Sequence, residues 1–176
     1  MASRNPDAIA LLKADHRRVE ELFAKFEKAK DGRRKRALAE EICTELAVHT
    51  TIEEEIFYPA CKGKVEKDLM NEAYVEHDGA KVLVAELSAG GPGDQFYDAK
   101  MKVLSEEIKH HVKEEEKPGE GVFSQLRESG IDLVDLADRM KARKEELLEQ
   151  FNAEGLPAPT TRSFKGPKLQ HGQVLG

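Results

Sequence analysis

Apolar side chains recur every three or four residues along most of the chain, which predicts α-helices that each bury one face. In four segments the period is near 3.5, as is typical of helices packed in a bundle. We call the inward positions of each segment its seam. The four seams are Ile9, Leu12, His16, Val19, Phe23, Phe26; Ile42, Leu46, His49, Glu53, Ile56; Met70, Ala73, His77, Ala80, Val84, Leu87; and Tyr97, Met101, Leu104, Ile108, His111, Glu115.

Helix-breaking residues give the approximate bounds of these helices. Asn5 as N-cap and Pro6 at the first helical position are a typical helix start. Breaks with glycine or proline fall at residues 31–32, 59–63, 90–93 and 117–121, and Asp94 is a candidate N-cap for the fourth helix.

The C-terminal part adds one more helix and a tail. Residues 122–130 predict a short helical turn, and residues 132–152 predict a fifth helix that braces the bundle. Three prolines and four glycines after residue 154 predict an extended or disordered arm, in which His171 is an incidental residue. We therefore expect an all-α bundle domain over residues 1–154 and an irregular tail over residues 155–176.

Charge and cysteine content narrow the expected partners. The net charge is −6 and the pI about 5.6, which argues against a nucleic-acid or anionic-membrane partner. The basic run at residues 33–36 could be a partner patch, but in an acidic chain we interpret it as a solvated helix start. Cys43 and Cys61 form no CxxC unit, and the apolar pattern predicts neither a signal peptide nor a membrane span. The expected location is the cytoplasm.

Each of the four seams carries one histidine, and two of them add a glutamate one turn later. These pairs are His49 with Glu53 and His111 with Glu115. A single inward histidine is usually a satisfied core residue, but burying four imidazoles and two carboxylates is costly without compensation. Metal-binding bundles place donors in this way. A purely structural polar network is the alternative.

The helix register separates two equally spaced pairs on the fourth helix. His110 and Glu114 are also four residues apart, but they fall beside Val103 on a mixed face. His111 and Glu115 lie on the apolar seam. The register therefore predicts that His111 and Glu115 form the inward pair.

The donor types limit the choice of metal. Imidazole and carboxylate without thiolate suit iron, manganese or zinc better than Cu(I) or an iron–sulfur cluster. Six protein ligands exceed what one tetrahedral zinc takes. These donors favour two metal ions bridged by Glu53 and Glu115.

The ordered pattern His16, His49-x-x-x-Glu53, His77, His111-x-x-x-Glu115 resembles the hemerythrin-like, or HHE cation-binding, family. The similarity covers about residues 7–152. It implies an antiparallel up-down four-helix bundle around two non-haem iron ions. The resemblance further implies that the four histidines are terminal ligands and the two glutamates bridging ligands.

One position departs from the oxygen-carrying members of that family, which have a further histidine where this chain has Ala73. Water, Tyr74 or, as second choice, Tyr58 could fill the gap, although ordinary packing with a surface hydroxyl is the usual role of such tyrosines. An open iron favours reaction with peroxide, nitric oxide or oxygen over reversible oxygen carriage.

The expected function is binding of oxygen or a related small molecule for sensing, storage or stress response. A catalase-like enzyme and an iron-handling repair module are the alternatives. The acids that flank the histidines, Asp15, Glu76 and Asp78, could orient imidazole rings, but adjacent helical residues point in different directions. We therefore expect these three acids to be surface charges.

Overall fold

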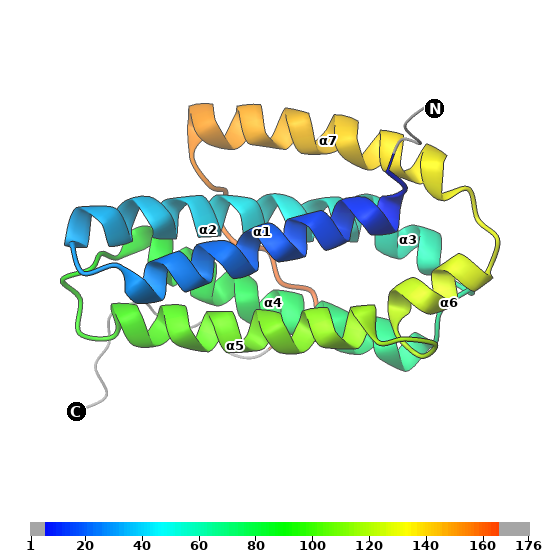
Figure 1. The fold of residues 1–176 in the computed structure, drawn as a ribbon, viewed down its shortest axis with the longest axis horizontal. Coiled ribbons are helices and arrows are strands. Elements are labelled where there is room, and N and C mark those ends of the chain that lie inside the picture. Colours follow the sequence, from blue (N-terminus) through cyan, green and yellow to red (C-terminus); the bar gives the residue numbers. More distant parts are fainter. Residues whose placement is uncertain (1–5, 166–176) are drawn as a thin grey trace.

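Four long helices form the body of the computed structural model, which describes residues 6–165 (Figure 1). They are α1 (Ala8–Lys28), α2 (Gly32–Ile52), α4 (Lys67–Ala89) and α5 (Tyr97–Glu116). Packing runs from α1 to α2, α4, α5 and back to α1, so the ring of helices is closed. The described residues contain helices and irregular segments and no strand, and the predicted all-α class is confirmed.

Short polar side chains define where the helices begin. Asp7 accepts a hydrogen bond from Ala10 N at 2.9 Å and caps α1, so the prediction of Asn5 as N-cap was wrong. Asp31 caps α2 in the same way through Arg34 N. The predicted cap Asp94 instead accepts from Gly91 N at 2.6 Å and closes the loop before α5.

The second helix continues past Pro59 and ends at Cys61, within the break that the sequence predicts at residues 59–63. It passes through one π-helical turn, η1 (Glu53–Phe57), and continues as α3 (Tyr58–Cys61). The N–H of Tyr58 donates to the carbonyl of Glu53, five residues earlier. This wider turn accommodates a proline, which in an α-helix would clash with the preceding turn. Phe57 is therefore fully buried, in place of the predicted Ile56.

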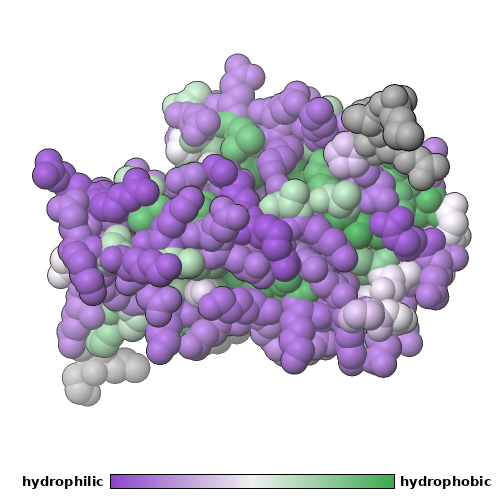
Figure 2. Space-filling model, in the orientation of Figure 1, coloured by the Kyte–Doolittle hydropathy of each residue, from purple (hydrophilic) through white to green (hydrophobic). Residues whose placement is uncertain are grey.

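Two further helices cover the bundle. The helix α6 (Val122–Glu128) follows α5, and α7 (Leu133–Glu154) packs across α1 and α2 as the predicted brace. Figure 2 shows a largely polar face, with apolar residues visible where α7 passes over the bundle. Within the described part, no helix is long and apolar enough to cross a membrane.

Beyond α7 the described tail is irregular and runs back along the bundle. Asp78 on α4 is buried, and its Oδ2 accepts from Ser163 N at 2.7 Å, Ser163 Oγ at 2.6 Å and Arg162 N at 3.0 Å. Residues 155–165 are therefore a strap tied to α4. The predicted tail residues after 165, His171 among them, lie outside the described residues.

The apolar core is divided into two clusters by a layer of buried polar side chains. One cluster joins the start of α1 with α3, α6 and α7, and the other joins the end of α1 with the first part of α2 and with α5. His16, His49 and His77 each lie where their helix passes from one cluster to the other. A polar layer that crosses the whole core needs internal partners for its charges.

Gly121 offers a test of the packing at the end of α5. A Cβ on this residue would lie 2.5 Å from the carbonyl oxygens of Glu114 and Glu115, which are backbone atoms with little room to move. We expect Gly121→Ala to lower the free energy of unfolding by about 1–3 kcal/mol, measured by urea denaturation. Gly93→Ala, with no atom within 4 Å of the new Cβ, is the matched control. Equal losses in both variants would contradict this account.

Candidate metal centre

Four buried histidines, one from each long helix, turn their Nε2 atoms toward a common centre. His16 Nε2 lies 3.2 Å from His49 Nε2, and His77 Nε2 lies 3.2 Å from His111 Nε2. Ring nitrogens with inward lone pairs cannot all face one another without a proton or a cation between them. The four side chains therefore form two imidazole pairs.

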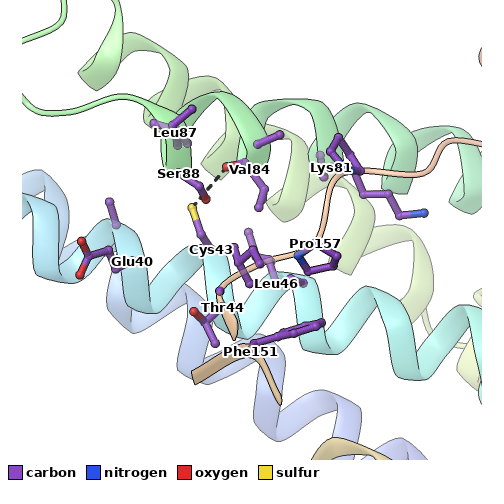
Figure 3. Close-up of a pocket in the computed structure, with 18 of the residues that line it drawn as sticks. Glu40, Cys43, Thr44, Leu46, Lys81, Val84, Leu87, Ser88, Phe151 and Pro157 are labelled. Carbon is purple, nitrogen blue, oxygen red and sulfur yellow. Dashed lines mark hydrogen bonds between the residues drawn. The ribbon is translucent and has the colours of Figure 1, made fainter. Parts of the chain in front are cut away.

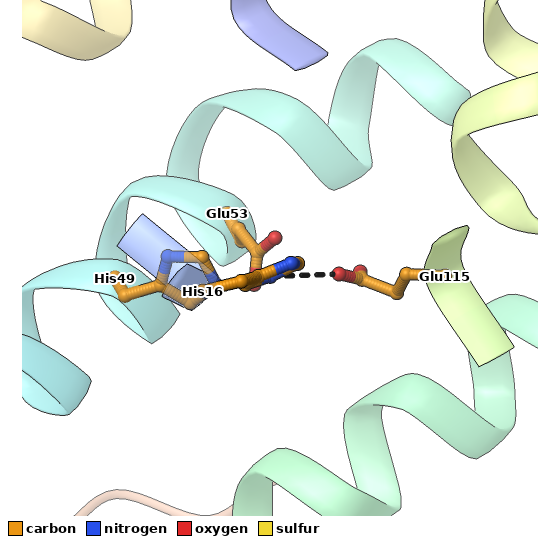
Figure 4. A group of neighbouring side chains, drawn as sticks. All are labelled: His16, His49, Glu53 and Glu115. Carbon is orange, nitrogen blue, oxygen red and sulfur yellow. Dashed lines mark hydrogen bonds and ion pairs between the residues drawn. The ribbon is translucent and has the colours of Figure 1, made fainter. Parts of the chain in front are cut away.

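Two fully enclosed carboxylates connect these pairs. Figure 4 shows both of them, Glu53 and Glu115, beside the pair of His16 and His49. Glu53 Oε2 lies 3.2 Å from Nε2 of both His49 and His77. Glu115 Oε2 lies 3.5 Å from His16 Nε2 and 3.6 Å from His111 Nε2. Each glutamate thus contacts one histidine of each pair.

The donor atoms form two overlapping groups that are able to hold metal ions. One group is His16, His49, Glu53 and Glu115. The other is Glu53, His77 and His111, and within each group the ligand atoms lie within 4.8 Å of one another. All six predicted residues are therefore brought together, and His110, 58% exposed on the outer face, is not among them.

The buried carboxylates of this cluster need positive charge beside them, either from protonated imidazoles or from bound metal ions. Burial lowers the pKa of His49, but Glu53 and Asp15 outweigh it and raise that pKa to about 10. Burial also lowers the pKa of His77, but Glu53 and Glu54 outweigh this effect and raise that pKa to about 9. Oε1 of Glu53 and Oε2 of Glu115 are buried and without a hydrogen-bond partner. Metal ions would satisfy these oxygens and replace the protons on the imidazoles, so the donor set fits the predicted metals.

A ring of carboxylates holds the outer nitrogen, Nδ1, of every histidine. Each of these acids is the sequence neighbour of a cluster residue on one helix and contacts the histidine of the next helix. The Nδ1–carboxylate distances are 3.5 Å for His49 with Asp15, 3.1 Å for His77 with Glu54, 2.6 Å for His111 with Glu76 and 2.7 Å for His16 with Glu116.

Hydrogen bonds at Nδ1 fix the tautomer and orientation of His16, His77 and His111 so that Nε2 faces inward. Asp15 faces His49 only as an ion pair, because the two atoms that face each other form no hydrogen bond. The expectation that Asp15 and Glu76 are only surface charges was therefore wrong. They do not orient the adjacent histidine but the one across the helix interface. The same expectation was wrong for Asp78, which is buried and holds the strap.

Cations hold three of the four orienting carboxylates from outside. Asp15 pairs with Lys144 of α7, Glu54 with Lys81 at 2.7 Å and Glu116 with Arg17 at 2.7 Å. Glu76 instead contacts His110 at 3.3 Å. The brace helix α7 is thus connected to the centre through Asp15.

Tyr58 is the second choice among the predicted extra ligands, and it lies in the cluster. Its hydroxyl donates to Glu115 Oε1 at 3.0 Å and lies 3.0 Å from His77 Nε2 and 3.4 Å from Glu53 Oε2. The side chain is only 2% exposed, so the expectation of a surface hydroxyl was wrong. Burial, together with Glu115 and Glu53, raises its pKa well above the ordinary value, which keeps the phenol protonated.

The π turn explains why the seam did not include Tyr58. Five residues on an α-helix span about 140° around the axis, which would turn Tyr58 away from Glu53. The i→i+5 bonding of η1 brings the two residues onto nearly the same side. Tyr74, the first choice, packs edge-on against Tyr58, with ring centroids 5.2 Å apart, and lies beneath the guanidinium of Arg162.

Aromatic residues from the covering helix close the end of the centre. The ring of Phe123 on α6 stacks on His16, with centroids 5.7 Å apart, and meets Phe57 edge-on. Ala73 belongs to the same apolar cluster and offers no donor. The side of the centre next to α6 is therefore dry.

A cavity of about 680 Å³ lies away from the metal centre, between α2, α4 and the strap (Figure 3). Leu46, Val84 and Pro157 are among its lining residues, and Cys43 lies beside Val84 with its Sγ 3.8 Å from the Val84 carbonyl oxygen. Burial raises the pKa of the Cys43 thiol to about 11, which keeps the thiol protonated at neutral pH. None of the six cluster residues lines this cavity.

The fold and the His/Glu clusters define a helical cation-binding protein. The chain belongs to the hemerythrin HHE cation binding domain family, which it matches over residues 7–118.

Two known proteins are similar to this chain. A crystal structure of a hemerythrin HHE cation binding domain-containing protein from Mycobacterium kansasii superposes with a TM-score of 0.68 at 21% identity, over 85% of this chain and 94% of that one. A DNA nickase from Nostoc sp. (strain PCC 7120 / SAG 25.82 / UTEX 2576) is 23% identical over 150 residues, 84% of this chain and 42% of the relative. The chain thus spans less than half the length of that curated relative.

The orienting ring can be tested at Glu76. Glu76→Ala removes the carboxylate from His111 Nδ1, and loss of such a partner typically weakens metal binding by about 10- to 100-fold. Competition with a calibrated chelator measures the affinity for Zn²⁺ or Co²⁺. Glu106→Ala, an exposed acid of α5 outside every candidate metal group of the described residues, is the control and should leave the affinity unchanged. Equal effects in both variants would show that only the general surface charge matters.

Proposed function

We propose that this chain is a non-haem di-iron protein that binds dioxygen, nitric oxide or peroxide in the cytoplasm, for sensing, storage or stress response. His16, His49, His77 and His111 act as terminal ligands, and Glu53 and Glu115 act as bridging ligands. The observation that carries this proposal is the sharing of each carboxylate between the two imidazole pairs. A bound iron pair would supply redox chemistry and an open position for a small ligand.

A small void beside the cluster supports a small ligand. Its volume is about 10 Å³, close to the least that holds one water molecule. The four cluster histidines, Asp15 and Thr50 line part of it, and Val19, Leu46, Ile108 and Val112 line the remainder. Space of this size has no room for an organic substrate, which favours a ligand of very few atoms.

Tyr58 supports a reactive centre over simple carriage. Its phenol lies within 3.0 Å of His77 Nε2 and of Glu115 Oε1, in the part of the centre where Ala73 supplies no histidine. In this position Tyr58 can donate a hydrogen bond to a bound ligand, or supply the extra oxygen ligand after losing its proton. The raised pKa of the phenol favours the hydrogen-bond donor in the absence of metal.

Metal analysis tests the proposed centre. The purified chain should hold close to two irons, and His111→Ala should reduce the iron content several-fold while His110→Ala leaves it near two. The reason is the register of α5, which puts His111 in the core and His110 on the surface. Elemental analysis after anaerobic loading measures the content. One tightly bound zinc, or equal losses in the two variants, would overturn the proposal.

A catalase-like activity is the second candidate, favoured by the buried phenol at the centre. In that case the iron-loaded protein should release oxygen from peroxide over many turnovers, followed with an oxygen electrode. Tyr58→Phe, which keeps the ring and removes the hydroxyl, should lower the rate about tenfold or more without loss of iron. Bleaching after a single turnover would leave binding as the function.

A further inference from the structure

One end of the bundle carries a concentrated positive charge that the metal centre does not use. Residues 25–36, with the sequence KFEKAKDGRRKR, hold seven lysines and arginines and two acids, a net charge of +5. The whole chain has a net charge of −6, so all other residues together carry −11. The net charge of −6 therefore hides a basic segment within an otherwise strongly acidic chain.

Most of these cations have no anionic partner. Lys35 pairs with Asp98, and Arg36 approaches Glu40 at 3.7 Å. The other five are exposed and form no ion pair within the described residues: Lys25, Lys28, Lys30, Arg33 and Arg34. We call these five residues the basic end. Glu27 and the N-cap Asp31 are the acids interspersed among them.

The fold gathers the basic end where α1 ends and α2 begins. Lys25 and Lys28 are neighbours on the last turn of α1, and Arg33 and Arg34 begin α2 directly after the short connection. This connection lies at the same end of the molecule as the loop between α4 and α5 (Figure 1). Pro92 of that loop lies 3.9 Å from a Cβ built on Gly32, so the two loops pack together.

We propose that the basic end binds the phosphate backbone of a nucleic acid, without reading its sequence. A row of cations along two helix ends suits a partner with regularly repeated charge, and guanidinium groups match phosphate geometry. An anionic membrane fits less well. Among the described residues, Phe96 is the one large exposed apolar side chain in the neighbouring loop, and stable membrane association needs more buried apolar surface than that.

The basic end is far from the candidate metal centre. Lys28 follows His16 by twelve residues of α1, about 18 Å at 1.5 Å per residue. Arg33 precedes His49 by sixteen residues of α2, about 24 Å. A nucleic acid on this surface would therefore leave the centre uncovered. Binding should not depend on bound iron.

Fluorescence anisotropy with a fluorescein-labelled 20-nucleotide DNA strand, alone and as a duplex, tests the proposal on the full chain. Three to five phosphate contacts predict a loss of affinity of about 20- to 500-fold between 50 and 200 mM salt. The variant Lys28→Ala/Arg33→Ala/Arg34→Ala should weaken binding at 50 mM salt at least tenfold. His111→Ala should bind DNA as the wild type does, so a failed metal centre and a failed basic end give different results.

The matched control removes three other exposed cations, Lys67, Arg139 and Lys141, and changes the net charge equally. It should keep wild-type DNA binding, and circular dichroism should report folded protein for both triple variants. Equal losses in the two variants, or no DNA binding at 50 mM salt, would overturn the proposal. So would selective binding to phosphatidylserine vesicles, or light scattering that shows the basic end joining two copies of this chain.

Discussion

The structure depends on how buried imidazoles are held with one nitrogen inward. Four histidines cross an apolar core, and each would be costly there without a partner at both ring nitrogens. Carboxylates at Nδ1 fix the outer side, and Glu53 and Glu115 face the inner side. Because every Nδ1 partner comes from a neighbouring helix, the interactions that orient the donors also hold the bundle together around its polar layer. Fold and site therefore share the same contacts.

The C-terminal part of the chain contributes ion pairs close to the candidate metal centre. Near the centre, α7 and the strap contribute through Lys144 and Arg162, which pair with Asp15 and Glu54, respectively. At the opposite end of the bundle, where the basic end lies, the start of α2 is polar and makes few interhelical ion pairs. The family match ends at residue 118, so these two C-terminal contacts lie outside the matched region. They provide a way for this chain to adjust a shared centre from outside.

Periodicity was enough to predict the helices and to place the six donors inside, because straight helices keep one face inward. It also distinguished His111 from His110, since a one-residue change of register moves a side chain by about 100°. The same reasoning left Tyr58 off the seam and ranked it behind Tyr74, because a π turn changes the relation between sequence spacing and direction. It also missed the roles of Asp15 and Glu76, which depend on contacts between helices. Such contacts cannot be seen in the spacing of a single helix.

The π turn at Glu53–Phe57 decides which aromatic side chain faces His77. Such a turn is equivalent to one additional residue inserted into an ordinary helix. If the same residues formed an α-helical turn, Phe57 would take the direction that Tyr58 has now, and Tyr58 would point away from Glu53. The phenol therefore keeps its place beside His77 only while the turn stays π-helical. The backbone geometry of this turn, together with the identity of residue 58, sets the group that faces the centre.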